Sequence, residues 1–325
     1  MKKILTIFAT YDKDNIIDDY VVYYLKKLSS ISDIIYVADC DIIENEFRKI
    51  KDYVIHIING RHGEYDFGSY KRGFLYAKDN NLLENYDYLI LCNDSCYGPF
   101  FDLGNIIDKL KKYHFTGIYY GTAKEVNYNY IGSFFYLLSK DIFLSNIFND
   151  FILSVQKEIN KGDIIQKYEF GLSKLMLDNN VVVNSIFTDN YEFKNRPYTD
   201  SASLIKEGFP FLKKHCLEKN STVPLNIDEL KDIIKIIKPN YDIKLMVNHL
   251  NRVADKEQIK YLFQKYKPYR KSFISDKIFL INNRYSPSGK FLISFRIFNC
   301  INIAFNKSIK KSYIECKHNN FDFLL

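Results

Sequence analysis

The stretch that decides the fold is 59–99, which reads NGRHGEYDFGSYKRGF at 59–74 and YDYLILCNDSCYGP at 86–99. Two apolar strand patterns, Val54–Asn59 and Tyr88–Cys92, each run into a cluster of polar residues and glycines. In an open α/β sheet, ligands bind outside the carboxyl ends of the strands. We therefore expect both clusters at one edge of a single sheet, where they form the candidate site.

Apolar runs alternate with helical patterns on both sides of this stretch. Strands are predicted at 3–10, 33–39, 54–59, 88–93, 115–120, 130–138 and 181–187, and helices at 17–28, after N-caps at Ser69 and Asp102, at 140–159 and at 168–178. This order predicts an α/β fold, a doubly wound and mostly parallel sheet with helices on both faces. The sequence has no GxGxxG and no GxxxxGK[ST], which argues against ordinary dinucleotide-binding and P-loop proteins.

The C-terminal third has a different pattern. Helices are predicted at 204–220, 226–238, 241–250 and 256–266, and a helical stripe fits Phe291, Phe295, Phe298, Phe305 and Ile309, although Ile301, Ile303 and Phe305 also alternate as in a strand. We expect a catalytic domain over 1–220 and a helical, basic region over 221–325. Residues 251–325 hold 15 Lys/Arg and 5 Asp/Glu, a balance of +10, against −3 for residues 1–250. Such a tail favours an anionic partner: lipid, nucleic acid or a charged glycan.

Composition narrows the cellular compartment. The 325 residues include six scattered cysteines with no CxxC pair, which is typical of a reducing compartment. Met1-Lys2-Lys3 leads into a short strand pattern, so no signal peptide is expected. No run of about 20 uncharged apolar residues predicts a membrane span. We expect a cytoplasmic protein.

Asn93-Asp94-Ser95 directly follows a buried strand pattern. A carboxylate at such a strand end can hold Mg²⁺ or Mn²⁺, which uses one or two carboxylates together with substrate phosphates. Asp94 is therefore a candidate metal ligand. The alternative is that Asp94 only caps the turn at Cys96-Tyr97-Gly98-Pro99.

Charged residues follow the preceding strand, at Arg61, Asp66 and Lys71. An arginine can bind a phosphate with two hydrogen bonds, and a lysine supplies a point charge. Asp66 could accept hydrogen bonds from sugar hydroxyls. The alternative is a surface loop whose charges pair with one another.

Two further positions have both a functional and a structural interpretation. Tyr11-Asp12 ends the first strand, where an aromatic ring and an acceptor suit a nucleotide base, or where they form the turn into the next helix. Glu169 begins a predicted helix and could be a general base for an acceptor hydroxyl, or could only favour the helix dipole. The six histidines show no metal-ligand spacing.

Four blocks together resemble the rhamnan synthesis protein F family. They are YDKDNIIDDYVVYYLKKL at 11–28, RHGEYDFGSYKRG at 61–73, LCNDSCYGPF at 91–100 and GFPFLKK at 208–214. The likeness covers about 1–220, and the YDFGSYK and NDSxYGP blocks are its most specific parts. It implies a bacterial glycosyltransferase of rhamnose-rich polysaccharide, capsule or lipopolysaccharide assembly. It also implies a GT-A-like fold and a nucleotide-sugar donor, such as a dTDP-, UDP- or GDP-sugar.

The resemblance also implies roles for individual residues. Donor-side positions are Asp12, Arg61, Asp66, Lys71, Asn93, Asp94 and Ser95, and Glu169 falls where the family has an acidic residue at a helix start. Two departures stand out. A His-x-Gln-Ser-Tyr-Phe block is YIGSFF at 130–135, and the Asp-x-Asp metal motif of many GT-A enzymes is reduced to Asn93-Asp94.

The resulting prediction is a glycosyltransferase that moves rhamnose or a similar sugar onto a growing cell-surface polysaccharide. The donor diphosphate would lie between the Arg61–Lys71 loop and Asp94, and the nucleotide base would lie near Tyr11. Glu169 would act as the general base for the acceptor hydroxyl. The basic tail would hold the enzyme on the inner face of the plasma membrane, near a glycan or lipid-linked acceptor, and nucleic acid is not an expected partner. Two alternatives stay open: transfer of another group from a nucleotide carrier, and a non-catalytic glycan-binding or scaffolding subunit.

Overall fold

The computed structural model describes 3–122, 128–190, 194–217, 225, 227–254 and five later strands between 279 and 324. The main sheet has eight strands in the order β3-β2-β1-β4-β8-β6-β7, with β9 paired to β6. The strands are β1 Ile4–Thr10, β2 Asp33–Ala38, β3 His56–Asn59, β4 Tyr88–Asn93, β6 Phe115–Thr122, β7 Asn129–Ile131, β8 Phe135–Ser139 and β9 Val183–Thr188. Strands β3, β2, β1 and β4 are parallel, as are β6 and β9, whereas β8 and β7 run antiparallel to their neighbours. This mixed, mostly parallel sheet confirms the predicted fold class.

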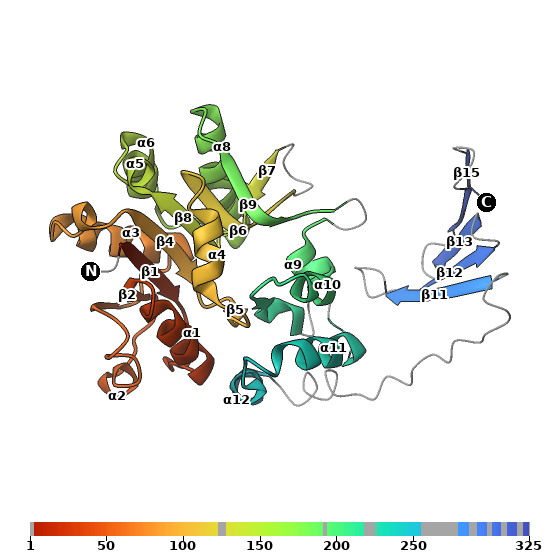
Figure 1. The fold of residues 1–325 in the computed structure, drawn as a ribbon, viewed down its shortest axis with the longest axis horizontal. Coiled ribbons are helices and arrows are strands. Elements are labelled where there is room, and N and C mark those ends of the chain that lie inside the picture. The colour runs from red at the N-terminus through yellow and green to blue at the C-terminus, as the bar shows by residue number, and fades with distance from the viewer. Residues whose placement is uncertain are drawn as a thin grey trace.

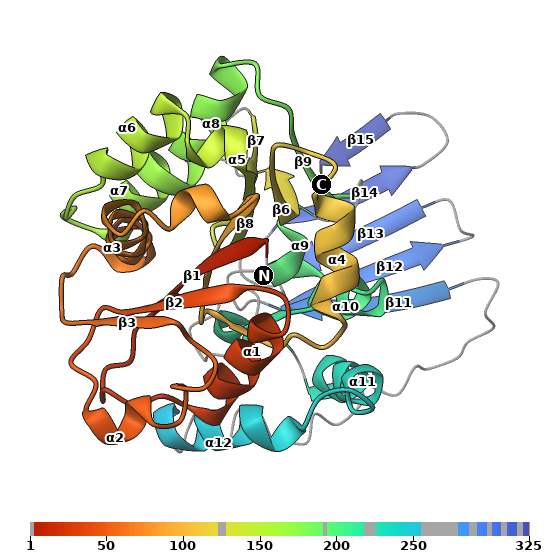
Figure 2. The same cartoon turned by 60° about the vertical axis from the view of Figure 1, so that its left-hand side comes forward.

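Helices cover both faces of the sheet (Figures 1 and 2). Alternation along β1 explains why, because Ile4 and Phe8 enter one apolar core and Leu5 and Ile7 enter the other. The first core takes residues of α1 Asp19–Ser29, α4 Leu103–Leu110, α10 Ser201–Lys206, α11 Ile227–Ile237 and α12 Ile243–Val253. The second takes residues of α3 Tyr65–Asp79, α5 Lys140–Phe143, α6 Asn146–Ser154, α7 Lys161–Ile164 and α8 Gly171–Asp178. Short helices α2 Glu44–Phe47 and α9 Arg196–Thr199 lie in connections.

Element boundaries follow local chemistry in some places and not in others. Asp102 is the N-cap of α4, as predicted, and its side chain accepts from the N–H of Asn105 over 2.9 Å. The predicted cap at Ser69 is wrong, because α3 already begins at Tyr65 and Ser69 is buried within it. The predicted helix over 204–220 is wrong beyond Lys206, because Gly208 and Pro210 follow the end of α10 and the chain then extends into a strand at Leu212–Lys213. Residues 218–220 lie outside the described part of the chain.

The strand order places a switch point between β1 and β4. From β1 the chain builds outward through β2 to β3, and then returns so that β4 pairs with the other side of β1. The carboxyl ends of β1 and β4 lie side by side, since Ala9 is the register partner of Asn93. Open α/β sheets bind ligands at such a position.

A short two-stranded ladder adds a later segment to this edge. Strand β10, Leu212–Lys213, pairs antiparallel with β5, Cys96–Tyr97, directly after β4. Gly98 permits the approach, because its φ is +127° and a Cβ there would lie 2.5 Å from the carbonyl oxygen of Pro210. The ladder therefore places Lys213 and Lys214 next to the switch point.

Among its described residues, the C-terminal region is helical in its first part and forms strands from Phe279 onward. Helices α11 and α12 pack on the same core as α1, whereas β11 Phe279–Tyr285, β12 Phe291–Ile297, β13 Ile301–Asn306, β14 Lys311–Cys316 and β15 Phe321–Leu324 form an antiparallel sheet in chain order. The helical stripe predicted beyond residue 290 is therefore wrong where the structure describes it. The alternation of Ile301, Ile303 and Phe305 prevails, since β-branched and aromatic residues favour strands. The helix predicted at 256–266 lies outside the described residues, and the domain boundary at 220 stays a prediction.

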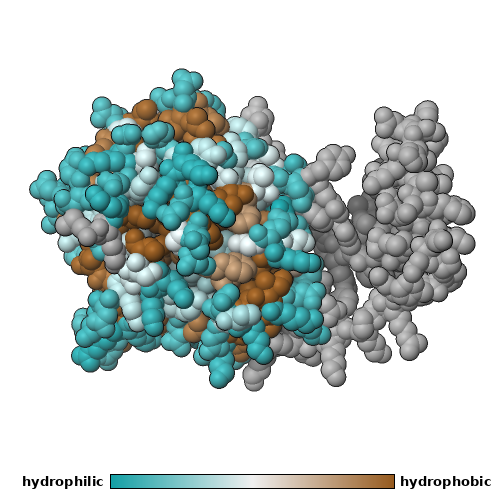
Figure 3. Space-filling model, in the orientation of Figure 1, coloured by the Kyte–Doolittle hydropathy of each residue, from teal (hydrophilic) through white to brown (hydrophobic). Residues whose placement is uncertain are grey.

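Among the described helices, none is long and apolar enough to cross a membrane. The coloured part of the face in Figure 3 mixes brown apolar patches with teal polar ones.

Candidate functional site

Four side chains form a hydrogen-bonded chain at the switch point. Asn93 Nδ2 donates to Asp66 Oδ2 over 2.7 Å, and Ser95 Oγ donates to Asn93 Oδ1 over 2.6 Å. Lys213 Nζ donates to Ser95 Oγ over 3.1 Å. The fold thus joins the first turn of α3, the end of β4 and strand β10. It brings together three residues that the sequence assigns to the donor side, Asp66, Asn93 and Ser95, and adds Lys213.

Asp94 contacts the α1 side of the sheet, because successive residues of an extended chain face opposite ways. Its Oδ2 accepts from Thr10 Oγ1 over 3.2 Å and lies 3.5 Å from Lys214 Nζ. Lys214 Nζ also donates to the Tyr20 hydroxyl over 2.7 Å, and that hydroxyl donates to the Asp94 carbonyl over 3.1 Å. Asp94 is buried, so its carboxylate and the Lys214 ammonium are held together at the switch point.

Asp66 is the carboxyl group of this cluster whose pKa is raised. Burial, and then the charge of Asp94, raise the pKa of the Asp66 carboxyl to about 6. Lys213 acts in the opposite direction on the same pKa. The cluster therefore holds two carboxyl groups close enough to interact, with cations beside them.

Asp66→Asn is expected to stabilise the free protein at neutral pH. Since the pKa of Asp66 is raised in the folded state, its contribution to stability is fully present below about pH 4 and is lost as the pH rises through 6. At pH 7 the variant should gain about 2 kcal/mol in free energy of unfolding, after allowance for solvent. The gain should shrink toward pH 4 in urea titrations. The exposed Asp79→Asn on the same helix is the control, and an equal pH dependence in both variants would contradict the assignment.

A cavity of about 420 Å³ opens beside the hydrogen-bonded chain. Its aromatic lining comes from Tyr119, Tyr130, Phe134, Phe170 and Tyr198. Six polar or charged residues also line it: Asn160, Asp163, Gln166, Glu169, Asn195 and Lys213. Aromatic walls with convergent polar groups are typical of small-ligand sites of this size.

Glu169 has a defined orientation in this cavity. Its Oε1 accepts a hydrogen bond from the N–H of Ser133 over 2.9 Å. The residue lies in a π-helical segment, Ile165–Phe170, between α7 and α8, and such segments are frequent at functional sites. The Glu169 carboxylate is thus held at the wall of a ligand-sized cavity, although not at the helix start that the sequence predicts.

Arg61 and Tyr11 lie at the same sheet edge. The guanidinium carbon of Arg61 is 5.9 Å from the centroid of the Tyr11 ring, within the range of a cation–π contact. Tyr11 is half exposed and directly follows Thr10, which contacts Asp94. Arg61, Tyr11 and Asp94 therefore share one edge of the sheet.

Asp12 is committed to other partners. Its Oδ1 accepts from the N–H groups of Asp14 and Ile16 over 2.9 and 3.1 Å, so Asp12 shapes the turn after β1. Arg252 of α12 pairs with Asp12, Asp14 and Asp18. Burial alone would raise the pKa of Asp12, but these hydrogen bonds and the Arg252 charge lower it.

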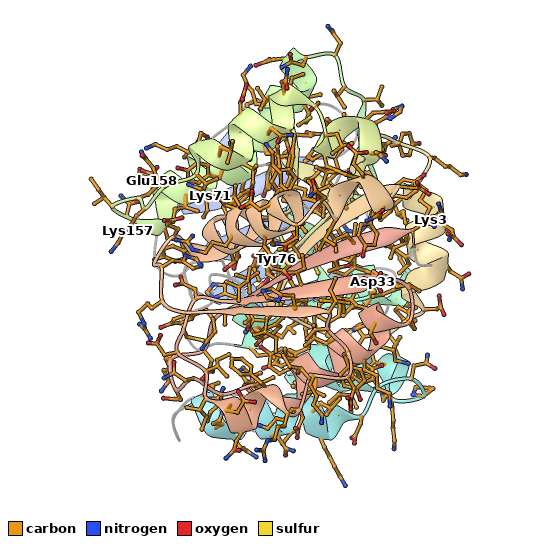
Figure 4. All side chains as sticks on the ribbon, turned by 90° about the vertical axis from the view of Figure 1, so that its left-hand side faces the viewer. Lys3, Asp33, Lys71, Tyr76, Lys157 and Glu158 are labelled. Atoms are coloured by element: carbon orange, nitrogen blue, oxygen red, sulfur yellow. The ribbon has the colours of Figure 1, made fainter. Side chains whose placement is uncertain are left out.

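Lys71 is not brought to the hydrogen-bonded chain. Its Nζ donates to the carbonyl oxygen of Val155 over 2.7 Å, and Figure 4 shows it near Lys157 and Glu158. Asp66 and Lys71 are five positions apart on α3, which separates them by about 140° around the helix. They therefore cannot both face the switch point.

A divalent cation has a limited donor set here. Among the described residues, no three His, Cys, Asp or Glu side chains converge to hold a metal ion. Mg²⁺ can use one or two carboxylates and complete its shell with waters and substrate phosphates. Asp94 therefore fits Mg²⁺ or Mn²⁺ as a single protein ligand, in the company of a phosphate-bearing ligand.

Comparison with known proteins defines the family. A family model described as rhamnan synthesis protein F matches residues 34–285. This chain belongs to the rhamnan synthesis protein F family. The virulence protein VirA of Vibrio anguillarum is 28% identical over 193 residues, which cover 49% of this chain and 60% of that protein. The chain thus spans less than two thirds of the curated relatives it matches.

Some solved structures show partial similarity to this family member. A putative nucleotide-diphospho-sugar transferase from Desulfovibrio desulfuricans has a TM-score of 0.32 and 14% identity, covering 64% of this chain and 96% of that one. TarS 1–349 of S. aureus has a TM-score of 0.37 and 12% identity, covering 90% and 96%. A cytidylyltransferase from Leptospira borgpetersenii has a TM-score of 0.38 and 12% identity, covering 74% and 95%.

The block in which this member of the rhamnan synthesis protein F family departs from the expected motif lies at the cavity. Within YIGSFF at 130–135, Tyr130, Gly132 and Phe134 line it, and Ser133 holds Glu169. The His and Gln of the expected motif are replaced here by Tyr130 and Gly132. The block thus supplies part of the cavity wall.

Sequence reasoning missed Lys213, Lys214, Tyr198 and Arg252. The signal for the two lysines was available, since GFPFLKK contributes to the family likeness and its proline argues against a helix interior. Arg252 gave no local signal, because its partners in the loop after β1 lie more than 230 residues earlier.

Proposed function

We propose that this protein is a glycosyltransferase that moves a sugar from a nucleotide-sugar donor onto a surface polysaccharide. Membership of the rhamnan synthesis protein F family supports the polysaccharide assignment. The observation that carries the proposal is the site itself. Carboxylates and ammonium groups lie at the switch point of the sheet, beside a cavity with aromatic lining residues. Rhamnose or a related sugar is the transferred group that the family suggests.

Each part of the site has a role in the proposal. The nucleotide lies over the Tyr11–Arg61 edge, and the diphosphate lies at Asp94 and the end of β4. The sugar extends into the aromatic cavity. When bound, Mg²⁺ or Mn²⁺ would be held by Asp94 and would offset diphosphate charge.

The proposed reaction transfers the sugar to an acceptor hydroxyl. The hydroxyl oxygen forms a bond to the anomeric carbon while the bond from that carbon to the diphosphate oxygen breaks. The leaving nucleoside diphosphate keeps the electron pair, and Glu169 takes the hydroxyl proton. General-base help of this kind contributes about 10²–10⁴-fold in rate.

A thermal-shift screen of dTDP-, UDP- and GDP-sugars tests the proposal. We expect the melting temperature to rise with at least one donor, by mass action on the folded state. A glycan-binding or scaffolding subunit would show no shift with any nucleotide sugar. The mass of the product then separates sugar transfer from transfer of another group.

Asp94→Asn is expected to weaken binding of a nucleoside diphosphate in the presence of Mg²⁺ or Mn²⁺ by about tenfold, equivalent to about 1.4 kcal/mol. The change removes the charge and keeps an oxygen that can accept from Thr10. Isothermal titration calorimetry measures the effect, with the exposed Asp108→Asn as control. Unchanged affinity would return Asp94 to the role of a turn residue.

We also propose reversible association with an anionic membrane surface through the basic and aromatic residues after Lys267. Each Lys or Arg near such a surface contributes about 1 kcal/mol. The full chain should float with vesicles containing anionic lipid in a density gradient and should stay behind with neutral vesicles. Lys307→Gln/Lys310→Gln/Lys311→Gln should reduce flotation, and equal flotation on both vesicle types would end this proposal.

A further inference from the structure

Lys213 is a buried cation with unused hydrogen-bonding capacity. The residue is 7% exposed, yet no carboxylate of the described residues lies within 4 Å of its ammonium group. Among the described residues, it donates to Ser95 Oγ over 3.1 Å and also to the Cys96 thiol. Sulfur is a weak acceptor and an ammonium has three donors, so Ser95 is the one strong acceptor that the described residues supply.

The surroundings of Lys213 hold its charge in place. Nζ lies 4.1 Å from the centroid of the Phe134 ring and 5.8 Å from that of Tyr198, and both rings line the 420 Å³ cavity. Burial alone would lower the pKa of Lys213, but the ionisable groups around it raise it, in the order Cys96, Tyr198, Glu169 and Asp66. The side chain is therefore charged at neutral pH and faces the cavity.

In the free protein, this arrangement buries a positive charge beside a neutral hydrogen-bond partner. Burying a charge is costly unless it is paired, and Ser95 is a neutral partner. A methionine of similar length could contact the same two rings, although it would remove the cation that favours the ionised form of Asp66. A buried ammonium at this position is explained if an anionic group of a ligand accepts hydrogen bonds from it.

The position of the neighbouring lysine identifies that group. Lys214 Nζ lies 3.5 Å from Asp94 Oδ2, at the carboxyl end of β4, and the antiparallel β5–β10 pairing fixes both lysines. One ammonium thus faces the switch point and the other faces the cavity. We propose that Lys213 and Lys214 bind the diphosphate of the donor, with the β-phosphate on Lys213 and the sugar beyond it in the cavity.

This inference rests on the proposed function and makes it more specific. It assigns part of the charge neutralisation of the leaving diphosphate to side chains rather than to a cation held by Asp94. The β-phosphate contact of Lys213 should therefore persist when divalent cations are removed. Charge-assisted hydrogen bonds to phosphate are among the strong ones in proteins.

The test is calorimetric titration of UDP, GDP and dTDP, and of their monophosphates, with EDTA and with Mg²⁺. Wild type should bind at least one diphosphate more tightly than its monophosphate in both conditions. Lys213→Met should reduce that preference at least about tenfold, and its melting temperature without ligand is the check that the variant is folded. Lys206→Met, at an exposed position of α10, is the control and should bind as wild type.

The outcomes separate the two proposals. If wild type binds none of these nucleotides, the proposed function fails. If it binds them and Lys213→Met keeps the full preference for the diphosphate, the lysine assignment fails while the function stands. If Lys213→Met unfolds, Lys213→Arg decides: a folded Lys213→Arg that keeps the diphosphate preference supports the anion site, and one that loses it overturns the assignment.

Discussion

Glu169→Gln should lower turnover at least about 10²-fold while donor affinity stays nearly unchanged. Glutamine keeps the shape and an oxygen that can accept from the Ser133 N–H, but it cannot take a proton from the acceptor hydroxyl. The loss should therefore appear in the rate of product formation and not in binding of the nucleotide sugar. Single-turnover kinetics with the donor found by the thermal-shift screen measures it.

Asp178→Asn is the matched control for Glu169→Gln. It changes a carboxylate at the exposed end of α8 that pairs only with Lys174 among the described residues, so turnover should stay near the wild-type value. Near-normal turnover of Glu169→Gln would remove Glu169 from the role of general base. Equal losses in both variants would point to a general effect on folding.

Arg252→Met should lower the free energy of unfolding by about 3 kcal/mol, because it leaves the partly buried carboxylates of Asp12 and Asp18 without the arginine and leaves the exposed Asp14 to Lys13. Arg252, together with His249, links α12 to the loop that follows β1, next to the proposed nucleotide position. Lys244→Met, at an exposed position of the same helix, should change stability by less than about 0.5 kcal/mol. Urea titration compares the variants.

The pH dependence gives a second measure of the Arg252 cluster. Although burial opposes it, the arginine lowers the pKa of Asp12 in the folded protein. The stability that Asp12 contributes is therefore present above the pKa of the unfolded chain, near 4, and is lost as the pH falls through the lowered pKa. The difference between wild type and Arg252→Met should be full at pH 7 and smaller below pH 4. A difference that does not change with pH would contradict the ion-pair account.

The sheet could be predicted because its information is local. Continuous apolar runs define β1, β2 and β4 to within one or two residues, and the polar residues after them mark the edge that binds ligands. Asp66, Asn93 and Ser95 meet because parallel strands end at one edge. The π-helical setting of Glu169 and the start of α3 left no comparable mark in the sequence.

The rest of the site depends on contacts between distant segments. Lys213 reaches Ser95 across 118 residues, through a ladder of two-residue strands that no periodicity reveals. Lys71 shares a motif with Asp66 but lies on another side of the helix, because helical geometry overrides proximity in sequence. In the tail, the same apolar residues satisfy both a helical and a strand pattern, and pairing between strands decides the outcome.

A crystal structure of the full chain with its nucleotide-sugar donor tests the central claim most directly. We expect the diphosphate within hydrogen-bonding distance of Lys213 and Lys214, beside Asp94, and the sugar in the aromatic cavity facing Glu169. Donor density at another surface, with this cavity and both lysines free of ligand, would contradict the account.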